Sequence, residues 1–321
     1  MEQVFDPARI SVIMPCYNAA PYVAEAVASV MEQSHPNMEL VVVDDGSTDA
    51  SVRILEDLAS RHVGRMRLLF QDRMGPYPAR NLGLAHASGG KIAFLDADDW
   101  WDRECMAKLD TALEAHGADI AYCGWQNVGE GAPGSDPYVP PDYRAMDTTV
   151  EFLRACPWPI HAALVRRTAI DAVRGFSERR FSAMDYDLWL RLYGRTNNIV
   201  RVPEVLAFYR WHGNGQISKA RWKQVLDAVD ARRNFVKNYP TRTSHLSRGR
   251  IDELTRGTLL REAYRAYWRR DLATAQPLFR RAFWHGLWQA ADLKYLGPSL
   301  LPALIFKSLV RTSDRLRNQD Q

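Results

Sequence analysis

The chain has 321 residues, of which 46% are hydrophobic and 25% are charged, a composition that excludes disordered and fibrous proteins and is typical of a globular one. The length suits one large domain or one domain with an appendage. The formal net charge of +4 hides an asymmetry, because the residues from Thr241 onward include 15 Lys and Arg against 7 Asp and Glu. An acidic body with a basic tail suggests that the two parts meet different partners.

Cysteine usage and terminal composition indicate the compartment. The four cysteines form no C-x-x-C pair, which favours reduced thiols and a cytoplasmic protein. The first residues show no basic stretch followed by an apolar run, so no signal peptide is expected. The most apolar later run, residues 295–306, contains Pro298 and Pro302 and is too short to span a bilayer as a helix.

The first hundred residues alternate predicted strands and helices. The strands are predicted at 10–14, 39–43, 67–70 and 92–95, and the helices from Pro21, after Ser47 or Thr48 as N-cap, and over 80–87. Gly75, Pro76 and Pro78 predict a loop before the third helix, and Gly89 and Gly90 predict its end. This alternation predicts an α/β fold with a Rossmann-like, mostly parallel sheet flanked by helices.

Polar side chains follow three of the four predicted strands: Tyr17 and Asn18 follow the first, Asp44 and Asp45 the second, and Asp96, Asp98 and Asp99 the last. In parallel sheets ligands bind outside the carboxyl ends of the strands. The convergence of polar groups at these ends therefore predicts an active site at this edge of the sheet.

The acids after the last strand, in the stretch KIAFLDADDWW, indicate a cation. Ionised carboxylates at the end of a buried strand raise one another's pKa unless a cation joins them. In extended chain Asp96 and Asp98 point to the same side, and oxygen ligands favour magnesium, manganese or calcium. The alternative is a polar turn in which Asp99 or Asp102 caps the next helix.

Five segments resemble, in order, the successive blocks of the family 2 inverting glycosyltransferases with the GT-A fold: ISVIMPCYN, ELVVVDDGSTD, ARNLGLAHASGGKIAFLDADDWW, GFSERRFSAMDYDLWLRL and YRWHGNGQIS. They span about residues 8 to 220, so the resemblance implies a GT-A domain over 1–220. It also implies transfer of a sugar from a nucleotide diphosphate sugar, with a UDP-sugar as the expected donor. The expected acceptor is a glycan or a lipid-linked oligosaccharide in surface polysaccharide biosynthesis, and no nucleic-acid partner is expected.

The resemblance also implies roles for single residues. The positions matching the nucleotide-sugar-binding residues are Pro15, Tyr17, Asn18, Asp45, Arg80, Asp96 and His212. Asp96 and Asp98 would form the D-x-D that meets the ribose and a divalent cation, Mn²⁺ or Mg²⁺. Other readings stay open, because Asp45 could be a helix-dipole acid, Tyr17 a core aromatic and Arg80 the partner of a helix carboxylate.

The catalytic base should come from a different part of the chain than Asp98, because inversion in one displacement needs it on the opposite face of the sugar. Asp185, implied as the base by the resemblance, begins the amphipathic segment DYDLWLRL, and Asp187 is the rival. Family members commonly have Glu before this Asp, whereas this chain has Met184, which puts any tuning of the base by that Glu in doubt.

Three other sequence features bear on the acceptor side and on the type of transferase. His161, in WPIHAALVRR, either lines the acceptor side or is a turn histidine. The Gln of the Q-x-x-R-W sequence of processive relatives is replaced by Ala207, which argues against a synthase that extrudes its product. The Gly- and Pro-rich stretch 124–143 predicts a loop or hairpin near the acceptor.

The remaining part, 221–321, is predicted to be a helical region. Helices are expected at 222–238, 251–269 and 272–291, the last two forming a hairpin. The tail 296–317 combines apolar and basic residues, which is typical of a helix lying on a membrane surface, here the inner face; packing on the hairpin or a dimer contact explains the same pattern. The alternatives to a transferase are a sugar-nucleotide-binding protein without turnover and a nucleotidyltransferase.

Overall fold

The computed structural model describes residues 5–130, 132, 134–177, 182–212, 221–286 and 288–319. The chain divides into two compact units, residues 1–216 and 217–321, close to the predicted boundary after residue 220. The predicted GNGQIS segment, 213–218, lies outside the described residues.

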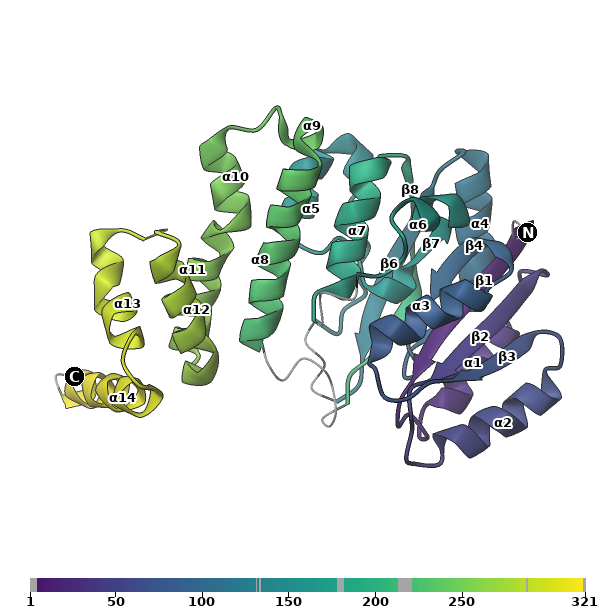
Figure 1. The fold of residues 1–321 in the computed structure, drawn as a ribbon, viewed down its shortest axis with the longest axis horizontal. Coiled ribbons are helices and arrows are strands. Elements are labelled where there is room, and N and C mark those ends of the chain that lie inside the picture. Colours follow the sequence, from purple (N-terminus) through teal and green to yellow (C-terminus); the bar gives the residue numbers. More distant parts are fainter. Residues whose placement is uncertain are drawn as a thin grey trace. The chain divides into compact units, whose positions relative to one another are not determined.

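The first unit is built on one mixed sheet (Figure 1). Its strands, in the order β3-β2-β1-β4-β7-β6-β8-β5, are β3 (Met66–Phe70), β2 (Met38–Asp44), β1 (Asp6–Cys16), β4 (Gly89–Phe94), β7 (Ala163–Arg166), β6 (Ile120–Val128), β8 (Ile199–Arg210) and β5 (Trp100–Trp101). The first four are parallel to one another, and β7 runs antiparallel to both β4 and β6. This confirms the predicted α/β fold with a largely parallel sheet.

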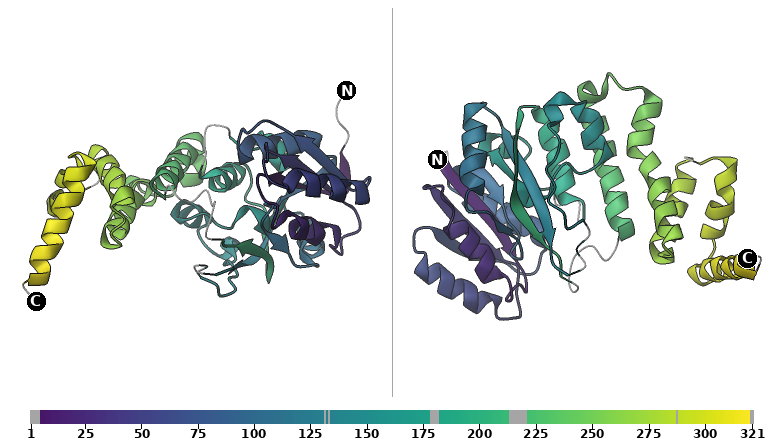
Figure 2. Two further views of the ribbon diagram at one scale, coloured as in Figure 1. Left: turned by 90° about the horizontal axis from the view of Figure 1, so that it is seen from below. Right: turned by 180° about the vertical axis from the view of Figure 1, so that it is seen from behind.

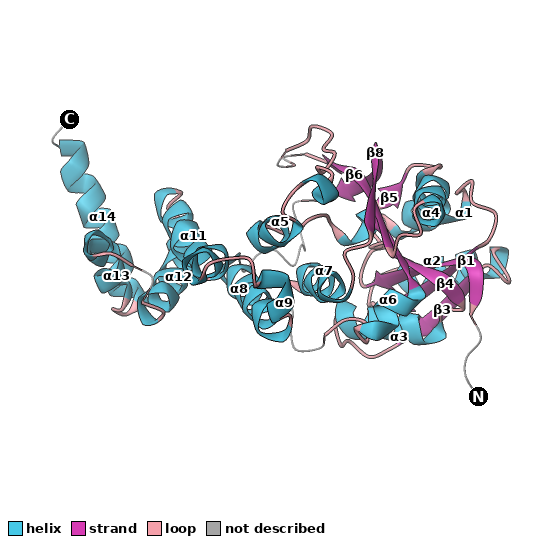
Figure 3. Ribbon diagram, turned by 90° about the horizontal axis from the view of Figure 1, so that it is seen from above, coloured by secondary structure: helices cyan, strands magenta, loops and turns pink. Residues whose placement is uncertain are grey.

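Helices cover both faces of this sheet, so its central strands are buried on both sides and read as continuous apolar runs. The helices are α1 (Val23–Met31), α2 (Ser51–Arg61), α3 (Pro76–His86), α4 (Cys105–Ala115), α5 (Thr148–Arg154), α6 (Arg167–Ala172) and α7 (Met184–Arg195). Figure 3 shows α1 and α4 on one side of the sheet and α3 and α6 on the other. Short 3₁₀ turns, η1 (Tyr143–Ala145) and η2 (Ile160–Ala162), join the later elements.

Two predicted boundaries around α3 are wrong. Pro76 and Pro78 lie in the first turn of the helix, where a proline costs no hydrogen bond. Gly89 and Gly90 begin β4 instead of ending the helix. A Cβ on Gly89 would lie 2.5 Å from the carbonyl oxygen of Arg9, so glycine is required there by the close approach of β1.

The predicted helix caps are also wrong. The second helix begins at Ser51, after Ala50, and Ser47 and Thr48 bind Asn18 instead. The Asn18 N–H donates to Ser47 Oγ (3.0 Å), and the Thr48 N–H donates to Asn18 Oδ1 (2.8 Å). These bonds join the loops after β1 and β2. Residue 104, not Asp99 or Asp102, is the N-cap of α4.

The second unit is built of helices in its described part, as Figures 1 and 2 show. They are α8 (Arg221–Asn238), α9 (Pro240–Thr243), α10 (Arg248–Thr255), α11 (Gly257–Trp268), α12 (Leu272–Trp284), α13 (Leu293–Ser299) and α14 (Ala303–Gln319). The predicted helix 251–269 is therefore two helices, α10 and α11, and the short helix α9 lies between α8 and α10.

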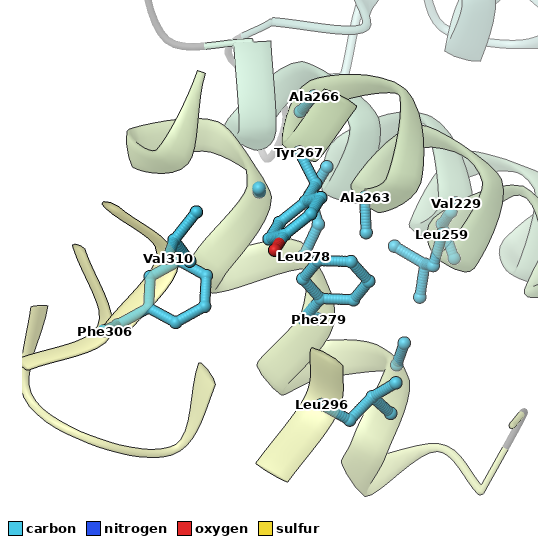
Figure 4. Close-up of a cluster of buried hydrophobic side chains, with 12 residues drawn as sticks. Val229, Leu259, Ala263, Ala266, Tyr267, Leu278, Phe279, Leu296, Phe306 and Val310 are labelled. Atoms are coloured by element: carbon cyan, nitrogen blue, oxygen red, sulfur yellow. The ribbon is translucent and has the colours of Figure 1, made fainter. Parts of the chain in front are cut away.

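The core of the second unit is formed largely by the two helices α11 and α12 (Figure 4). Leu259 and Ala263 from α11 are fully buried against Leu278 and Phe279 from α12. Phe306 of α14 joins the same cluster. Among the described residues, no helix combines the length and apolar character needed to cross a bilayer.

Candidate active site

The loops that carry the predicted site residues follow neighbouring strands. Cys16 at the end of β1 pairs with Asp44 at the end of β2, and Ile13 of β1 pairs with Phe94 at the end of β4. Because these strands are parallel, the loops after them open at one edge of the sheet. The predicted convergence of Tyr17, Asp45 and Asp96 at that edge is thus what the register produces.

Asp45 is buried and holds the loop between β3 and α3. Its Oδ1 accepts hydrogen bonds from Gln71 Nε2 (2.7 Å) and the Met74 N–H (2.7 Å), and its Oδ2 accepts one from the Gly75 N–H (2.9 Å). Gly75 has a φ of 96°, which L side chains rarely adopt. The carboxylate therefore fixes a loop that needs glycine at position 75.

Tyr17 is 37% exposed, so it is not the core aromatic of the alternative reading. The guanidinium carbon of Arg73 lies 3.3 Å from the centroid of its ring. Pro15, by contrast, is buried within β1. Sequence reasoning missed Arg73, because nothing in the local pattern distinguishes it from a surface arginine. The Arg73 guanidinium therefore covers one face of the Tyr17 ring.

Arg80 is only 3% exposed and forms an ion pair with Asp96. It thus pairs with an acid of the D-x-D rather than with a helix carboxylate. Its Nη1 also donates to the sulfur of Met184 (3.4 Å). Burial lowers the pKa of Arg80, but the carboxylates of Asp96 and Asp185 more than offset this and raise it. The buried guanidinium therefore keeps its charge.

Asp185 lies in the first turn of α7, and the Ile160 N–H donates to its carboxylate. Burial raises the pKa of Asp185 to about 6; Asp96 adds to the rise and Arg80 opposes it. The rival Asp187 is buried and paired with Arg191 Nε (2.7 Å). Asp187 is thus committed to a structural ion pair, whereas Asp185 is partly exposed.

Asp98 faces His212, whose Nε2 lies 2.9 Å from Asp98 Oδ2. The His212 ring stacks on Tyr22, with centroids 5.2 Å apart. Both side chains of the pair are partly exposed. Burial and the neighbouring Asp96 raise the pKa of Asp98, while the hydrogen bond from His212 opposes the rise.

Tyr209, near the end of β8, indicates that the acids converge. After burial, the carboxylates that raise the pKa of Tyr209 are those of Asp99, Asp96, Asp98 and Asp185. Asp99 is itself buried and accepts a hydrogen bond from the Arg210 N–H (2.8 Å). The candidate base and the D-x-D acids, far apart in sequence, therefore all act on the charge of one tyrosine.

The described residues contain no group of three or more His, Cys, Asp or Glu side chains arranged to hold a metal ion. Magnesium commonly takes only one or two carboxylates from the protein and completes its shell with substrate phosphates and water. The adjacent Asp98 carboxylate and His212 imidazole are suitable donors for a cation of that kind.

The mixed α/β sheet flanked by helices is the GT-A fold of glycosyltransferases. The pattern described as "Glycosyl transferase family 2" matches residues 11–174, half of the chain, and the chain belongs to that family.

Relatives in the family carry only broad descriptions. An uncharacterized glycosyltransferase of Haemophilus influenzae is 41% identical over 109 residues, which cover 33% of this chain and 43% of that protein. The putative teichuronic acid biosynthesis glycosyltransferase TuaG of Bacillus subtilis is 28% identical over 216 residues, 67% of this chain and 83% of the relative. The chain therefore spans less than half of the first relative and most of the second.

Solved structures share the fold. TarS 1-349 of S. aureus has a TM-score of 0.64 at 19% identity, covering 98% of this chain and 92% of the other. Its complex with UDP-GlcNAc has a TM-score of 0.60, also at 19% identity and with the same coverage. The mannosyltransferase PcManGT of Pyrobaculum calidifontis, in complex with GDP-Man and Mn²⁺, has a TM-score of 0.60 at 21% identity and covers 96% and 86% of the two chains.

Proposed function

We propose that this chain is an inverting glycosyltransferase that moves a sugar from a UDP-sugar to a hydroxyl of a glycan or lipid-linked acceptor. The observation that carries the proposal is that Arg80 joins the two parts of the site: it pairs with Asp96 of the D-x-D and contacts Met184, the neighbour of Asp185. Inverting transfer needs a proton acceptor on one face of the sugar and charge stabilisation on the other. These two functions here come from separate parts of the chain.

Asp185 is the proposed base, which takes the proton from the acceptor hydroxyl as the new glycosidic bond forms. A base works best when its pKa lies near the working pH, and burial brings the pKa of Asp185 to about 6. The Ile160 N–H and the charge of Arg80 hold the carboxylate in place. A positioned base of this kind contributes about 100- to 10,000-fold in rate.

Asp98 and His212 are the proposed protein ligands of a divalent cation, Mn²⁺ or Mg²⁺, with Asp96 beside them on the ribose side. Such a cation, when bound, supplies Lewis-acid stabilisation to the leaving diphosphate. Arg80 pairs with Asp96 rather than with Asp98, and a bound cation would replace the contact between Asp98 Oδ2 and His212 Nε2. The Mn²⁺ in the PcManGT complex supports this assignment at the level of the fold.

The nucleotide end of the donor is proposed to bind at Tyr17 and the loop that Asp45 holds. Arg73 covers one face of the Tyr17 ring, so a base would stack on its other face or displace the guanidinium. Asn18 and Pro15 shape the same loop. UDP and UDP-GlcNAc in the TarS complexes support a uracil base, whereas the GDP-Man in PcManGT makes guanine the alternative to test.

The described role of TuaG in teichuronic acid biosynthesis supports an acceptor in surface polysaccharide assembly. A cytoplasmic protein that uses a lipid-linked acceptor would work at the inner face of the membrane. On α14, Leu304 is 83% exposed, and Ile305 and Leu309 are also exposed, whereas Phe306 and Val310 face the core of the second unit (Figure 4). One apolar face is thus left over after packing.

We propose that this exposed face lies on an anionic membrane surface, because basic residues outnumber acidic ones from Thr241 onward. The test is flotation of the full chain with vesicles containing phosphatidylglycerol or phosphatidylcholine alone. Binding to the anionic vesicles should be lost in a Leu304→Ser/Ile305→Ser/Leu309→Ser variant. Equal recovery of that variant, or a wild-type chain that self-associates through this face without floating, would refute the membrane assignment.

Transfer itself is tested by release of nucleoside diphosphate from a panel of UDP- and GDP-sugars, with and without manganese. Release from one donor, increased by acceptor and by the cation, is the expected result. The alternative, a donor-binding protein without turnover, is favoured only by Met184, which replaces the acid common in relatives. Tight donor binding with neither transfer nor hydrolysis at any cation concentration would decide for that alternative.

A further inference from the structure

The turn η2 contains a histidine that no part of the proposed chemistry uses. His161 is fully buried, and neither of its ring nitrogens makes a hydrogen bond of good geometry with any described residue. Its Nδ1 lies 3.3 Å from Asp99 Oδ2, and both side chains are completely shielded from solvent. The imidazole also stacks on Tyr209, with centroids 5.7 Å apart and planes inclined by 12°.

The surroundings of His161 favour a neutral ring. Burial lowers the pKa of His161 to about 4; the charge of Arg80 also lowers it, and Asp96 opposes this. A neutral imidazole carries one N–H, and placing it on Nδ1 directs it toward the Asp99 carboxyl. The remaining Nε2 lone pair then faces the interior, which costs less than a buried N–H without an acceptor.

Each side of the turn is tied to a different half of the proposed site. The Ile160 N–H, one residue before His161, donates to the Asp185 carboxylate. The His161 carbonyl accepts a hydrogen bond from Trp101 Nε1 (2.7 Å), just beyond the D-x-D segment. The His161 ring faces Asp99, whose other oxygen accepts from the Arg210 N–H.

Asp99 also holds the segment that carries the proposed cation ligands. The Arg210 N–H that it binds lies two residues before His212, and Arg210 Nε donates to the Asp98 carbonyl (2.8 Å). The end of β8 and the D-x-D segment are thereby cross-linked beside the contact between His212 and Asp98. The buried contact between His161 and Asp99 therefore links the turn that binds Asp185 to the segment that carries the proposed cation ligands.

We propose that His161 is a positioning residue: its Nδ1–H, directed at Asp99 Oδ2 3.3 Å away, holds the η2 turn against the D-x-D segment and so sets where Asp185 stands relative to Asp98. The proposal rests on the proposed transferase function. The acceptor-side role considered for His161 from the sequence does not fit a side chain with no exposed surface.

The substitutions that test it are His161→Asn and His161→Leu. An asparagine amide can place an N–H near the position of Nδ1, whereas leucine fills the space without a donor. For a donor that the wild-type chain uses, His161→Leu should lower kcat by about 10- to 100-fold with the donor KM within threefold, as loss of positioned base catalysis requires. His161→Asn should recover most of kcat. Leu113→Ala in α4, a buried substitution away from the turn, controls for lost stability and should leave kcat unchanged.

A second measurement needs no turnover. Hydrogen exchange of the Ile160 and Arg210 amides in the full chain should be about tenfold faster in His161→Leu, slow in His161→Asn and unchanged in Leu113→Ala. Unchanged exchange in His161→Leu, or a kcat within twofold of wild type, overturns the proposal. An inactive wild-type chain whose amides respond as expected would instead place the failure with the transferase function.

Discussion

Replacing Asp185 with Asn should abolish transfer and at the same time stabilise the protein at alkaline pH. The pKa of this carboxyl is raised from an ordinary value of 3.8 to about 6, mainly by burial. A raised pKa means that the folded state disfavours the charged carboxylate more than the unfolded state does. The contribution of the wild-type carboxyl to stability is therefore greatest below about pH 4 and is lost as the pH rises through about 6.

The size of the effect on stability follows from the shift in the pKa of Asp185. The two pKa values differ by about two units, and each unit corresponds to ~1.4 kcal/mol, so the ionised carboxylate costs up to ~3 kcal/mol at pH 8. The neutral amide of Asp185→Asn avoids that cost and can still accept from the Ile160 N–H. The variant should therefore unfold at higher urea concentration than the wild type at pH 8, and the difference should shrink toward pH 4.

Although Asp185→Asn should stabilise the protein at pH 8, it should greatly lower the rate of transfer. Asp185→Asn cannot take the acceptor proton, so kcat should fall by about 100- to 10,000-fold while donor binding persists. In the wild type, kcat should fall about tenfold per pH unit below pH 6, as a single essential base requires.

Asp187→Asn is the matched control, because the same substitution two residues away breaks the ion pair with Arg191. It should destabilise the protein and leave kcat within a few fold of wild type. The reasoning fails if Asp185→Asn retains a tenth of the wild-type turnover, or if it is destabilised equally at pH 8 and pH 4.5.

Three further outcomes are expected. Asp98→Asn should raise the manganese concentration needed for half-maximal transfer by more than tenfold, measured by titration of the cation; an unchanged requirement would exclude Asp98 as a ligand. Tyr17→Leu should raise the donor KM by about tenfold and leave kcat nearly unchanged, since lost stacking is worth roughly 1–3 kcal/mol; a fall in kcat alone would contradict the nucleotide role. Leu278→Ala should cost about 2–5 kcal/mol in urea unfolding of the second unit, and a loss below ~1 kcal/mol would show that the cluster repacks.

The sequence predicted the sheet well because its signal is local. The runs at Ile10 to Met14 and Glu39 to Val43 are buried on both faces, so they contain almost no polar interruption. The acids and the tyrosine that end these strands mark where the chain leaves the sheet. The parallel order of the strands then brings those ends together, and that order follows from the alternation of strands and helices.

Contacts between distant segments could not be predicted in the same way. Gly89 looked like a helix end, but its lack of a side chain serves the approach of Arg9 from β1. Ser47 looked like a helix cap, but it binds Asn18 on another loop. His161 stood in an apolar stretch with no sign of its contact with Asp99. In each case the sequence shows the chemical type of the residue but not the residue that it contacts, because that partner lies elsewhere in the chain.

The acidic cluster shows how such partners change a chemical argument. Three neighbouring carboxylates seemed to require a cation, since they repel one another. The structure gives each a different environment: Asp96 pairs with Arg80, and burial raises the pKa of Asp99 well above its ordinary range, so that its carboxyl holds a proton more readily. Asp98 is partly exposed and lies beside His212. Repulsion within the cluster is therefore relieved largely by the protein itself, and the cation would be drawn in chiefly by the diphosphate of the donor. On this reasoning the affinity for manganese should be weak without nucleotide and should rise when the diphosphate adds its oxygens to those of Asp98.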